Sequence, residues 1–419
     1  MFTTYGAVLG LLLAIVLIIR KVTPAYALIL GALAGGLVGG GGLVTTVNAM
    51  IDGTKGMMPS VLRILASGVL VGALVKTGGA AKIADAIVGF LGVRFALAAV
   101  ALATMIICAV GVFIDISVIT VAPIALAVGR RAALPVPALL LAMIGGGKAG
   151  NIISPNPNTI AAADAFGLDL TSLMAANILP ALCAFAATIA LATALSKRGG
   201  VRTDPAGTGL PDAASAVSAS SPKLAAALAG PAAVVALLAL RPLFGLAVDP
   251  LIALPAGGIV CSVVCGRWRE TVANSEYGLS KVIGVSILLI GTGTIAGIVK
   301  GSGLNADMIA LLNALKLPTL ALAPVSGFLM AGATASTTAG ATIAAQTFSG
   351  ALVSAGVPAL ASAAMIHAGA TVIDSLPHGS FFHATGGSVG MSVKERLRLI
   401  PYEAAVGLVS TVAAVLTSL

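Results

Sequence analysis

Long apolar runs that contain few charged residues are the feature that most constrains this chain. Only 9% of its 419 residues are Asp, Glu, Lys or Arg, and 58% are hydrophobic, whereas about 25% of a typical soluble domain is charged. A soluble globule of this size needs polar side chains over its surface. The composition therefore excludes a soluble enzyme, a nucleic-acid binder and a disordered chain, and it predicts an all-α polytopic membrane protein.

The chain contains two copies of one plan. Lys and Pro are rare inside its apolar runs, so their ordered recurrence at a nearly constant offset of 221–224 positions indicates a duplication. The matches are Val75-Lys76-Thr77-Gly78-Gly79 with Val299-Lys300-Gly301-Ser302-Gly303, Pro137 with Pro358, Pro155 with Pro377, and Pro180 with Pro401. We predict one repeat over 1–198, a flexible linker rich in Gly, Pro, Ala and Ser over 199–222, and a second repeat over 223–419.

Each repeat is predicted to hold five spanning segments, because a spanning helix needs about 20 apolar residues. In the first repeat they are 4–19, 24–47, 60–75, 134–166 and 173–195, and in the second 223–246, 250–266, 279–299, 357–388 and 399–418. The fourth segment of each repeat is broken, at Gly145–Asn158 and at Gly369–Ser380. Short amphipathic pieces are expected at 80–91 and 304–315.

Two further apolar runs are predicted to be re-entrant hairpins, which enter and leave by the same face. Both 94–129 and 318–350 are too long for one crossing, and each has a polar interruption, at Phe113–Ser117 and at Thr334–Thr338. Five crossings is an odd number, so the repeats are expected to be inverted, with both termini outside. Most Lys and Arg then lie on one face, as the positive-inside rule requires; the opposite face holds Lys55, Arg63, Arg241, Lys300 and Lys316.

The four interruptions predict a binding site near the middle of the bilayer. Unpaired backbone groups survive at that depth only where protein or a watery cavity covers them. Half-helix N-termini placed there favour anionic groups, and unwound carbonyls can hold a cation.

The tip of the first hairpin carries Asp115 and Ser117. Asp115 either caps a half-helix or binds substrate or a coupling ion, since an acid inside a membrane is costly and usually functional. The matching tip of the second repeat offers hydroxyl groups at Ser336, Thr337 and Thr338. These either contact substrate or bond back to their own helix.

The first broken segment contains one cation, Lys148. It either pairs with Asp115 or Asp374, or receives a substrate carboxylate. Uncharged amide and hydroxyl groups follow it, and they suit a hydroxylated ligand or a structural Pro–Asn turn. These candidate substrate-binding residues are Asn151, Ser154, Asn156, Asn158 and Thr159.

The second broken segment is the most informative stretch, because Asp374, Ser375 and His378 lie together in it. Two titratable side chains so close in a membrane segment make a plausible proton relay. We predict that these three residues couple transport to protons. The sequence leaves the roles of His367, His383 and Asp164 open. Arg63 is expected to snorkel to an interface.

The same stretch resembles a known family. Asp374-Ser375-Leu376-Pro377-His378-Gly379, continuing to Gly390-Met391-Ser392-Val393-Lys394-Glu395, resembles the C-terminal region of the gluconate permease (GntP) family of proton symporters, and Val75-Lys76-Thr77-Gly78-Gly79 is also similar to that family. More distantly, Gly145–Asn158 and Ser336-Thr337-Thr338 resemble the unwound loops and hairpin tips of divalent anion:sodium symporters, in the wider ion transporter superfamily.

The resemblance implies a carboxylate or sugar-acid substrate coupled to protons and carried by an elevator motion. It implies scaffolds at 1–91 and 223–315 and moving transport parts at 94–198 and 318–419. It also implies a homodimer, since elevator carriers commonly form dimers.

Together these features predict a multi-pass protein of the cell inner membrane that imports a small organic anion with H⁺. Its expected partners are the anion, protons and lipid, with no nucleic acid and no cofactor. The alternative is a cation:proton antiporter in which Asp115 and Asp374 bind a small cation directly. A membrane enzyme or channel is less favoured, because no metal-ligand spacing or nucleophile constellation is present.

Overall fold

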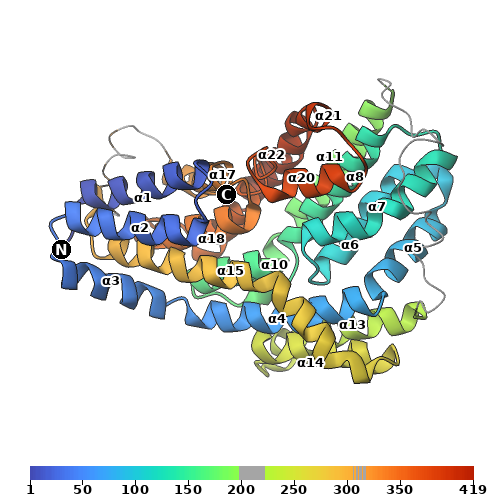
Figure 1. Ribbon diagram of the computed structural model, residues 1–419, viewed down its shortest axis with the longest axis horizontal. Helices are drawn as coiled ribbons and strands as arrows, with labels where there is room; N and C mark the ends of the chain where they lie inside the picture. Colours follow the sequence, from blue (N-terminus) through green and yellow to red (C-terminus); the bar gives the residue numbers. More distant parts are fainter. Residues whose placement is uncertain (198–221, 305, 308–309, 311–313, 315–317) are drawn as a thin grey trace.

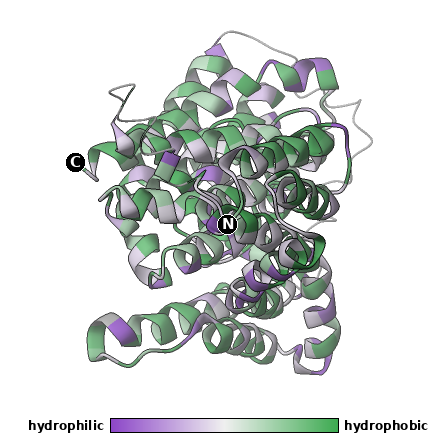
Figure 2. Ribbon diagram, turned by 90° about the vertical axis from the view of Figure 1, so that its left-hand side faces the viewer, coloured by the Kyte–Doolittle hydropathy of each residue, from purple (hydrophilic) through white to green (hydrophobic). Residues whose placement is uncertain are grey.

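The computed structural model describes residues 1–197, 222–304 and 318–419, together with 306, 307, 310 and 314. Every regular element in these ranges is a helix. Hydrophobic residues predominate along the helices, and hydrophilic residues are scattered among them (Figure 2). The predicted linker at 199–222 and amphipathic piece at 304–315 fall almost entirely outside the described residues.

Six described segments are long and apolar enough to cross a membrane. They are Met58–Lys76, Val136–Ala165, Ile178–Lys197, Leu224–Arg241, Trp268–Lys300 and Val393–Leu416. Shorter apolar helices are Thr4–Ile19, Pro24–Val38, Pro250–Val264, Thr319–Thr334 and Ala359–Gly369. The prediction of an all-helical membrane protein is confirmed.

The first three helices lie at one end of the molecule, and the fourth runs from there toward the middle (Figure 1). They are α1 (Thr4–Ile19), α2 (Pro24–Val38), α3 (Leu43–Lys55) and α4 (Met58–Lys76). The prediction of one span over 24–47 is wrong. Helix α2 stops at Val38 because a run of four glycines follows, and Gly40 adopts a left-handed conformation with φ +87°.

The first predicted hairpin consists of two packed helices. After α5 (Gly79–Leu91) and the short η1 (Val93–Phe95), α6 (Ala96–Ala109) runs to a turn at 110–113, and α7 (Ile114–Arg131) returns against it. The interruption lies earlier than the sequence indicates, because Asp115 and Ser117 belong to the first turn of α7.

The first broken segment follows as α8 (Val136–Ile152) and α9 (Pro157–Ala165). Its break is shorter than predicted, since the glycine-rich part from Gly145 remains helical. The predicted span 173–195 is divided into α10 (Leu170–Ala176) and α11 (Ile178–Lys197).

The second half again contains long helices, then two packed helices, then a broken segment. Helices α13 (Leu224–Phe244) and α14 (Pro250–Val264) are followed by η2 (Trp268–Glu270) and α15 (Thr271–Lys300), which starts eight residues before the predicted 279. After η3 (Thr319–Ala321), α17 (Leu322–Thr334) and α18 (Thr337–Ser354) pack together as the second hairpin.

The second broken segment consists of α19 (Ala359–Gly369), an irregular stretch at 370–379 and α20 (Ser380–Gly387), as the sequence predicts. The chain closes with α21 (Val393–Leu397) and α22 (Ile400–Leu416). Helix α22 packs against α8, α11 and α19, so the two broken segments meet beside it.

Candidate functional site

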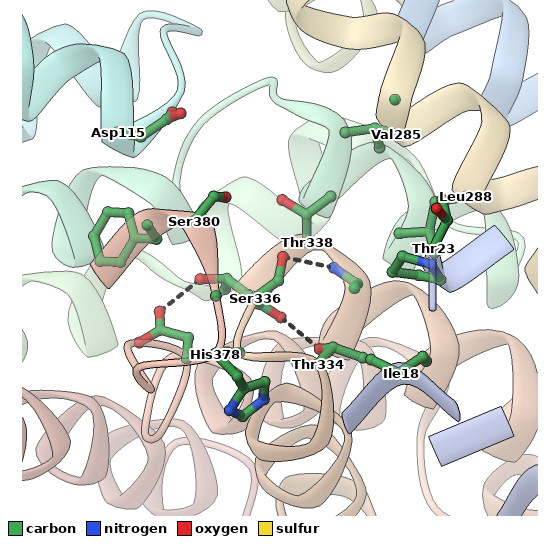
Figure 3. Close-up of a pocket in the computed structure, with 18 of the residues that line it drawn as sticks. Ile18, Thr23, Asp115, Val285, Leu288, Thr334, Ser336, Thr338, His378 and Ser380 are labelled. Atoms are coloured by element: carbon green, nitrogen blue, oxygen red, sulfur yellow. Dashed lines mark hydrogen bonds between the residues drawn. The ribbon is translucent and has the colours of Figure 1, made fainter. Parts of the chain in front are cut away.

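A cavity of about 790 Å³ lies where the two hairpin tips and the second broken segment meet. Its walls include the tip of α7, the turn between α17 and α18, the stretch before α20, the turn between α1 and α2, and one side of α15. Figure 3 shows Asp115, Ser336, Thr338 and Ser380 around this space. Segments separated by more than 200 residues therefore form one site.

Four helices begin at the wall of this cavity: α2, α7, α18 and α20. Ser336 caps α18 by accepting a hydrogen bond from the Ala339 N–H. The N-caps of α2, α7 and α20 have no side-chain cap bond. Free backbone N–H groups and the positive ends of helix dipoles favour an anion.

Two glycines allow the hairpin tips to approach the broken segments. A Cβ on Gly147 of α8 would lie 2.6 Å from Ile114 Cγ1, at the tip of the first hairpin. A Cβ on Gly379 would lie 2.4 Å from the Ala335 carbonyl oxygen, at the tip of the second. Ala335 is itself held in a left-handed conformation, φ +47°. Both contacts depend on the missing side chain.

Lys148 and Asp374 form a buried ion pair, with 2.7 Å between Nζ and Oδ1 and side chains that are 1% and 2% exposed. Lys148 Nζ also donates to the backbone oxygens of Thr371 and Glu403. Asp374 accepts from Ser375 Oγ at 3.0 Å and from Thr337 Oγ1 at 2.6 Å. Of the two alternatives for Lys148, the geometry supports pairing, with Asp374 rather than Asp115.

A second buried ion pair, between Arg396 and Glu403, is connected to the first through the Glu403 backbone oxygen. The guanidinium of Arg396 donates to the carboxylate of Glu403 and to Thr385 Oγ1, and it stacks 4.9 Å from the Phe382 ring centroid. Arg396 and Glu403 are each 1% exposed. The sequence gives no local signal for this pair, which joins α20, α21 and α22.

The predicted asparagine stretch forms an internal network rather than a cavity wall. Asn156 donates to Asn151 Oδ1 at 2.6 Å and caps α9 by accepting from the N–H groups of Asn158 and Thr159. Ser154 is buried, and Ser117 bonds back to the Phe113 oxygen at 2.9 Å. The large cavity is lined by none of the predicted residues of this group, which are Ser117, Asn151, Ser154, Asn156, Asn158 and Thr159. Three buried atoms, Asn151 Nδ2, Ser154 Oγ and Asn158 Oδ1, have no partner among the described residues.

The cavity wall contains most of the remaining predicted residues and several that the sequence left aside; Ser375 is buried and does not line it. Asp115, Ser336, Thr337, Thr338, Asp374 and His378 line it, and so do Lys21, Thr23, Lys281, Ser380 and His383. His378 Nε2 lies 3.2 Å from the Ala333 oxygen and His383 Nε2 lies 2.8 Å from the Pro377 oxygen. His367 is fully buried, does not line the cavity, and has no described hydrogen-bond partner.

A separate charged cluster joins α4, α9 and α14. The guanidinium of Arg63 pairs with Asp164 and with Asp249, where Nη2 lies 2.6 Å from Oδ2. The nearby Arg241 pairs with Asp169. These residues line a smaller cavity of about 310 Å³. Arg63 therefore links three helices, which is a structural role.

Comparison with known proteins identifies the family. The GntP permease family matches residues 2–419. The chain belongs to this family. A transporter of Haemophilus influenzae, described as uncharacterized, is 53% identical over 411 residues, which cover 98% of this chain and 97% of the relative.

Part of the sequence is also similar to a relative whose substrate is named. The high-affinity gluconate transporter of Escherichia coli is 26% identical over 166 residues, or 39% of this chain and 37% of the relative. The permease is a membrane transporter and not an enzyme.

Two solved transporters share the fold. The YdaH transporter of Alcanivorax borkumensis has a TM-score of 0.60 at 17% identity, with 90% of this chain and 88% of the other covered. MtrF of Neisseria gonorrhoeae, described within a class of antimetabolite efflux pumps, has a TM-score of 0.62 at 14% identity, with 90% and 84% covered.

Proposed function

We propose that this permease is a secondary transporter that imports a small hydroxy-carboxylate, such as a sugar acid, together with H⁺ by alternating access. The observation that carries the proposal is the convergence of four helix N-termini on one cavity whose wall also holds hydroxyl and charged side chains. Such ends favour anions and do not favour cations.

The carboxylate of the substrate would bind at these helix ends, with Lys21 and Lys281 at the cavity wall adding positive charge. Its hydroxyl groups would bond to hydroxyl side chains of the same wall, which are Thr23, Ser336, Thr338 and Ser380. The likeness to a gluconate transporter supports this substrate class.

His378 and His383 suit proton transfer at the cavity wall. Each has Nε2 within hydrogen-bond distance of a backbone oxygen, so Nε2 carries the hydrogen and donates it to that oxygen. The sequence also predicts a proton-coupling role for Asp374 and Ser375. Asp374 lines the same wall, where it is held in an ion pair with Lys148.

The transport cycle that we propose moves 94–198 and 318–419 against scaffolds formed by 1–91 and 223–315, in a homodimer within the inner membrane. The paired hairpins and broken segments in each half support two inverted repeats. The cavity wall contains residues of both parts, since Lys21 and Lys281 come from the scaffolds while Asp115 and Ser336 come from the transport parts.

The test is uptake into proteoliposomes. Purified permease should accumulate labelled gluconate or a related hydroxy acid when the lumen is alkaline, and a proton ionophore should abolish the accumulation. A sodium gradient without a pH gradient should have no effect. Cation efflux driven by protons, without binding of any acid in a thermal-shift panel, would instead favour the antiporter.

A further inference from the structure

We propose that Asp115 is the carboxylate that binds the coupled proton, and that the Lys148–Asp374 pair is a permanent tie between the two halves. The inference rests on the proposed function and assigns a role within the same cavity. It differs from the expectation drawn from the sequence, which gives the proton to Asp374.

Asp374 is poorly placed to exchange a proton. Both of its carboxylate oxygens already accept hydrogen bonds, one from Lys148 and Ser375 and the other from Thr337. Protonation would remove the negative charge that stabilises a buried ammonium group. Leaving such a charge unpaired in a protein interior costs about 3–5 kcal/mol.

Lys148 is likewise fully engaged. Its three N–H donors match three acceptors, namely the Asp374 carboxylate and the backbone oxygens of Thr371 and Glu403. These acceptors lie in the second broken segment and in α22, whereas Lys148 lies in α8. Its side chain therefore fastens the first broken segment to the second, and it has no donor left for a substrate carboxylate.

Asp115 is placed differently. It stands in the first turn of α7, lines the cavity and is only partly buried. Its carboxylate interacts with the backbone N–H groups of Asp115 and Ile116 at the start of α7 and feels the charge of Lys281. No salt bridge within 4.0 Å joins it to any residue that the structure describes. Figure 3 shows its side chain reaching from α7 toward the space also lined by Ser380 and Thr338. Asp115 can gain or lose a proton without breaking a buried pair.

The surroundings of Asp115 contain both signs of charge. The titratable and charged groups on the cavity wall and on the elements packed against α7 are Lys21, Lys82, Asp85, Arg94, Cys108, Lys148, Lys281, Asp374, His378 and His383. Lys148 and Asp374 neutralise each other, and Lys82 and Asp85 form their own pair. Asp115 is thus the unpaired acid among the described residues of the cavity wall.

This arrangement couples the proton to the anion through charge alone. An ionised Asp115 beside the helix ends repels an incoming carboxylate, and a protonated Asp115 does not. Proton and anion therefore bind cooperatively, and the anion in turn favours the protonated form. The bound anion and the bound proton then carry no net charge together when the cavity opens from one side of the membrane to the other.

The test measures the dissociation constant of gluconate, or of the acid that the uptake panel selects, across a series of pH values. In the wild type the affinity should fall about tenfold for each pH unit above the pKa of Asp115, because only the protonated form binds well. Asp115→Asn should bind at every pH with the affinity that the wild type shows in acid.

The control replaces both partners of the Lys148–Asp374 ion pair at once. Lys148→Met/Asp374→Leu leaves no unpaired buried charge, and it should keep the pH dependence of the wild type. A pair variant that loses the pH dependence, or an Asp115→Asn variant that keeps it, would overturn the assignment.

A second measurement needs no substrate. The infrared difference spectrum between acid and neutral pH should contain a carboxylic-acid band that disappears in Asp115→Asn and persists in the pair variant; the reverse pattern would also overturn the assignment. A wild type that shows this band but binds no organic acid would refute the proposed function and leave the proton site standing.

Discussion

Arg396 and Lys148 are the two largest fully buried side chains of the described chain, and each is held by one carboxylate and further oxygen acceptors. The two pairs are connected, because the backbone oxygen of Glu403 accepts from Lys148 while its carboxylate binds Arg396. Glu403, in the first turn of the last helix, is therefore buried within the protein. Single charges inside this protein are compensated locally, and the sequence shows the charges but not their partners.

Lys148→Met is expected to destabilise the folded protein by about 3–5 kcal/mol, because it leaves Asp374 buried without its cation. Asp374→Leu should cost a similar amount, and the double variant should cost less than either. Thermal unfolding in detergent checks the cycle. The matched control is Lys55→Met, whose pair with Asp52 is 72% and 69% exposed and should contribute little. If the double variant lost as much stability as the two single variants added together, Lys148 and Asp374 would not be stabilised by pairing with each other.

At the scale of elements, the hairpins and broken helices are held together by close backbone contacts. The tip of the second hairpin sits against Gly379, just before α20, and the tip of the first sits against Gly147 in α8. Helix ends that must present N–H groups to a ligand need such contacts, because a displacement of about 1 Å is enough to weaken binding substantially.

Gly379→Ala is expected to weaken substrate binding at least about tenfold, because its Cβ would meet the Ala335 oxygen and push the hairpin tip away. Gly387→Ala, at the end of α20, is the control, since a Cβ there meets nothing within 4 Å. Dissociation constants of the two variants decide the matter. Equal affinity in both would show that the tip does not depend on this contact.

The Arg63 cluster joins α4 to α9 and to the start of α14. Its contribution to the stability of the folded protein should depend on pH. Hydrogen bonding to Arg63 holds the pKa of Asp249, which precedes α14, below its usual range. A group with a lowered folded pKa adds stability that is present above its ordinary pKa and lost as pH falls through the folded value.

Asp249→Asn should therefore lower the Tm at neutral pH, and the difference from the wild type should shrink below about pH 4. Tm measured over a pH series checks this. Asp52→Asn, at the exposed Lys55 pair, should change the Tm little at any pH. A difference for Asp249→Asn that grows as the solution becomes more acidic would contradict the sign.

At the scale of the whole molecule, both halves contribute residues to the large cavity, and Lys21 and Lys281 lie on its wall. The positive-inside rule places these residues on the cytoplasmic side, with Lys55 and Arg63 on the other. We therefore predict that this part of the cavity wall faces the cytoplasm.

Single cysteines introduced into a cysteine-free background test the orientation. In intact cells, a membrane-impermeant thiol reagent should label Lys55→Cys and leave Lys21→Cys and Arg131→Cys unlabelled. Permeabilised cells should label all three. Labelling of Lys21→Cys in intact cells would invert the predicted orientation of the first two helices.

The sequence by itself determined the membrane class, the positions of most helices and the places where they break, because hydropathy and the backbone preferences of Gly and Pro act over a few residues. It also indicated that Asp115, Lys148 and Asp374 belong to the interior. Only the tertiary structure decided that Lys148 pairs with Asp374, that the asparagines bond to one another, and that Lys281 and His383 reach the cavity. Those contacts join elements far apart along the chain, and a pairing across more than 200 residues depends on how helices pack, which no local pattern records.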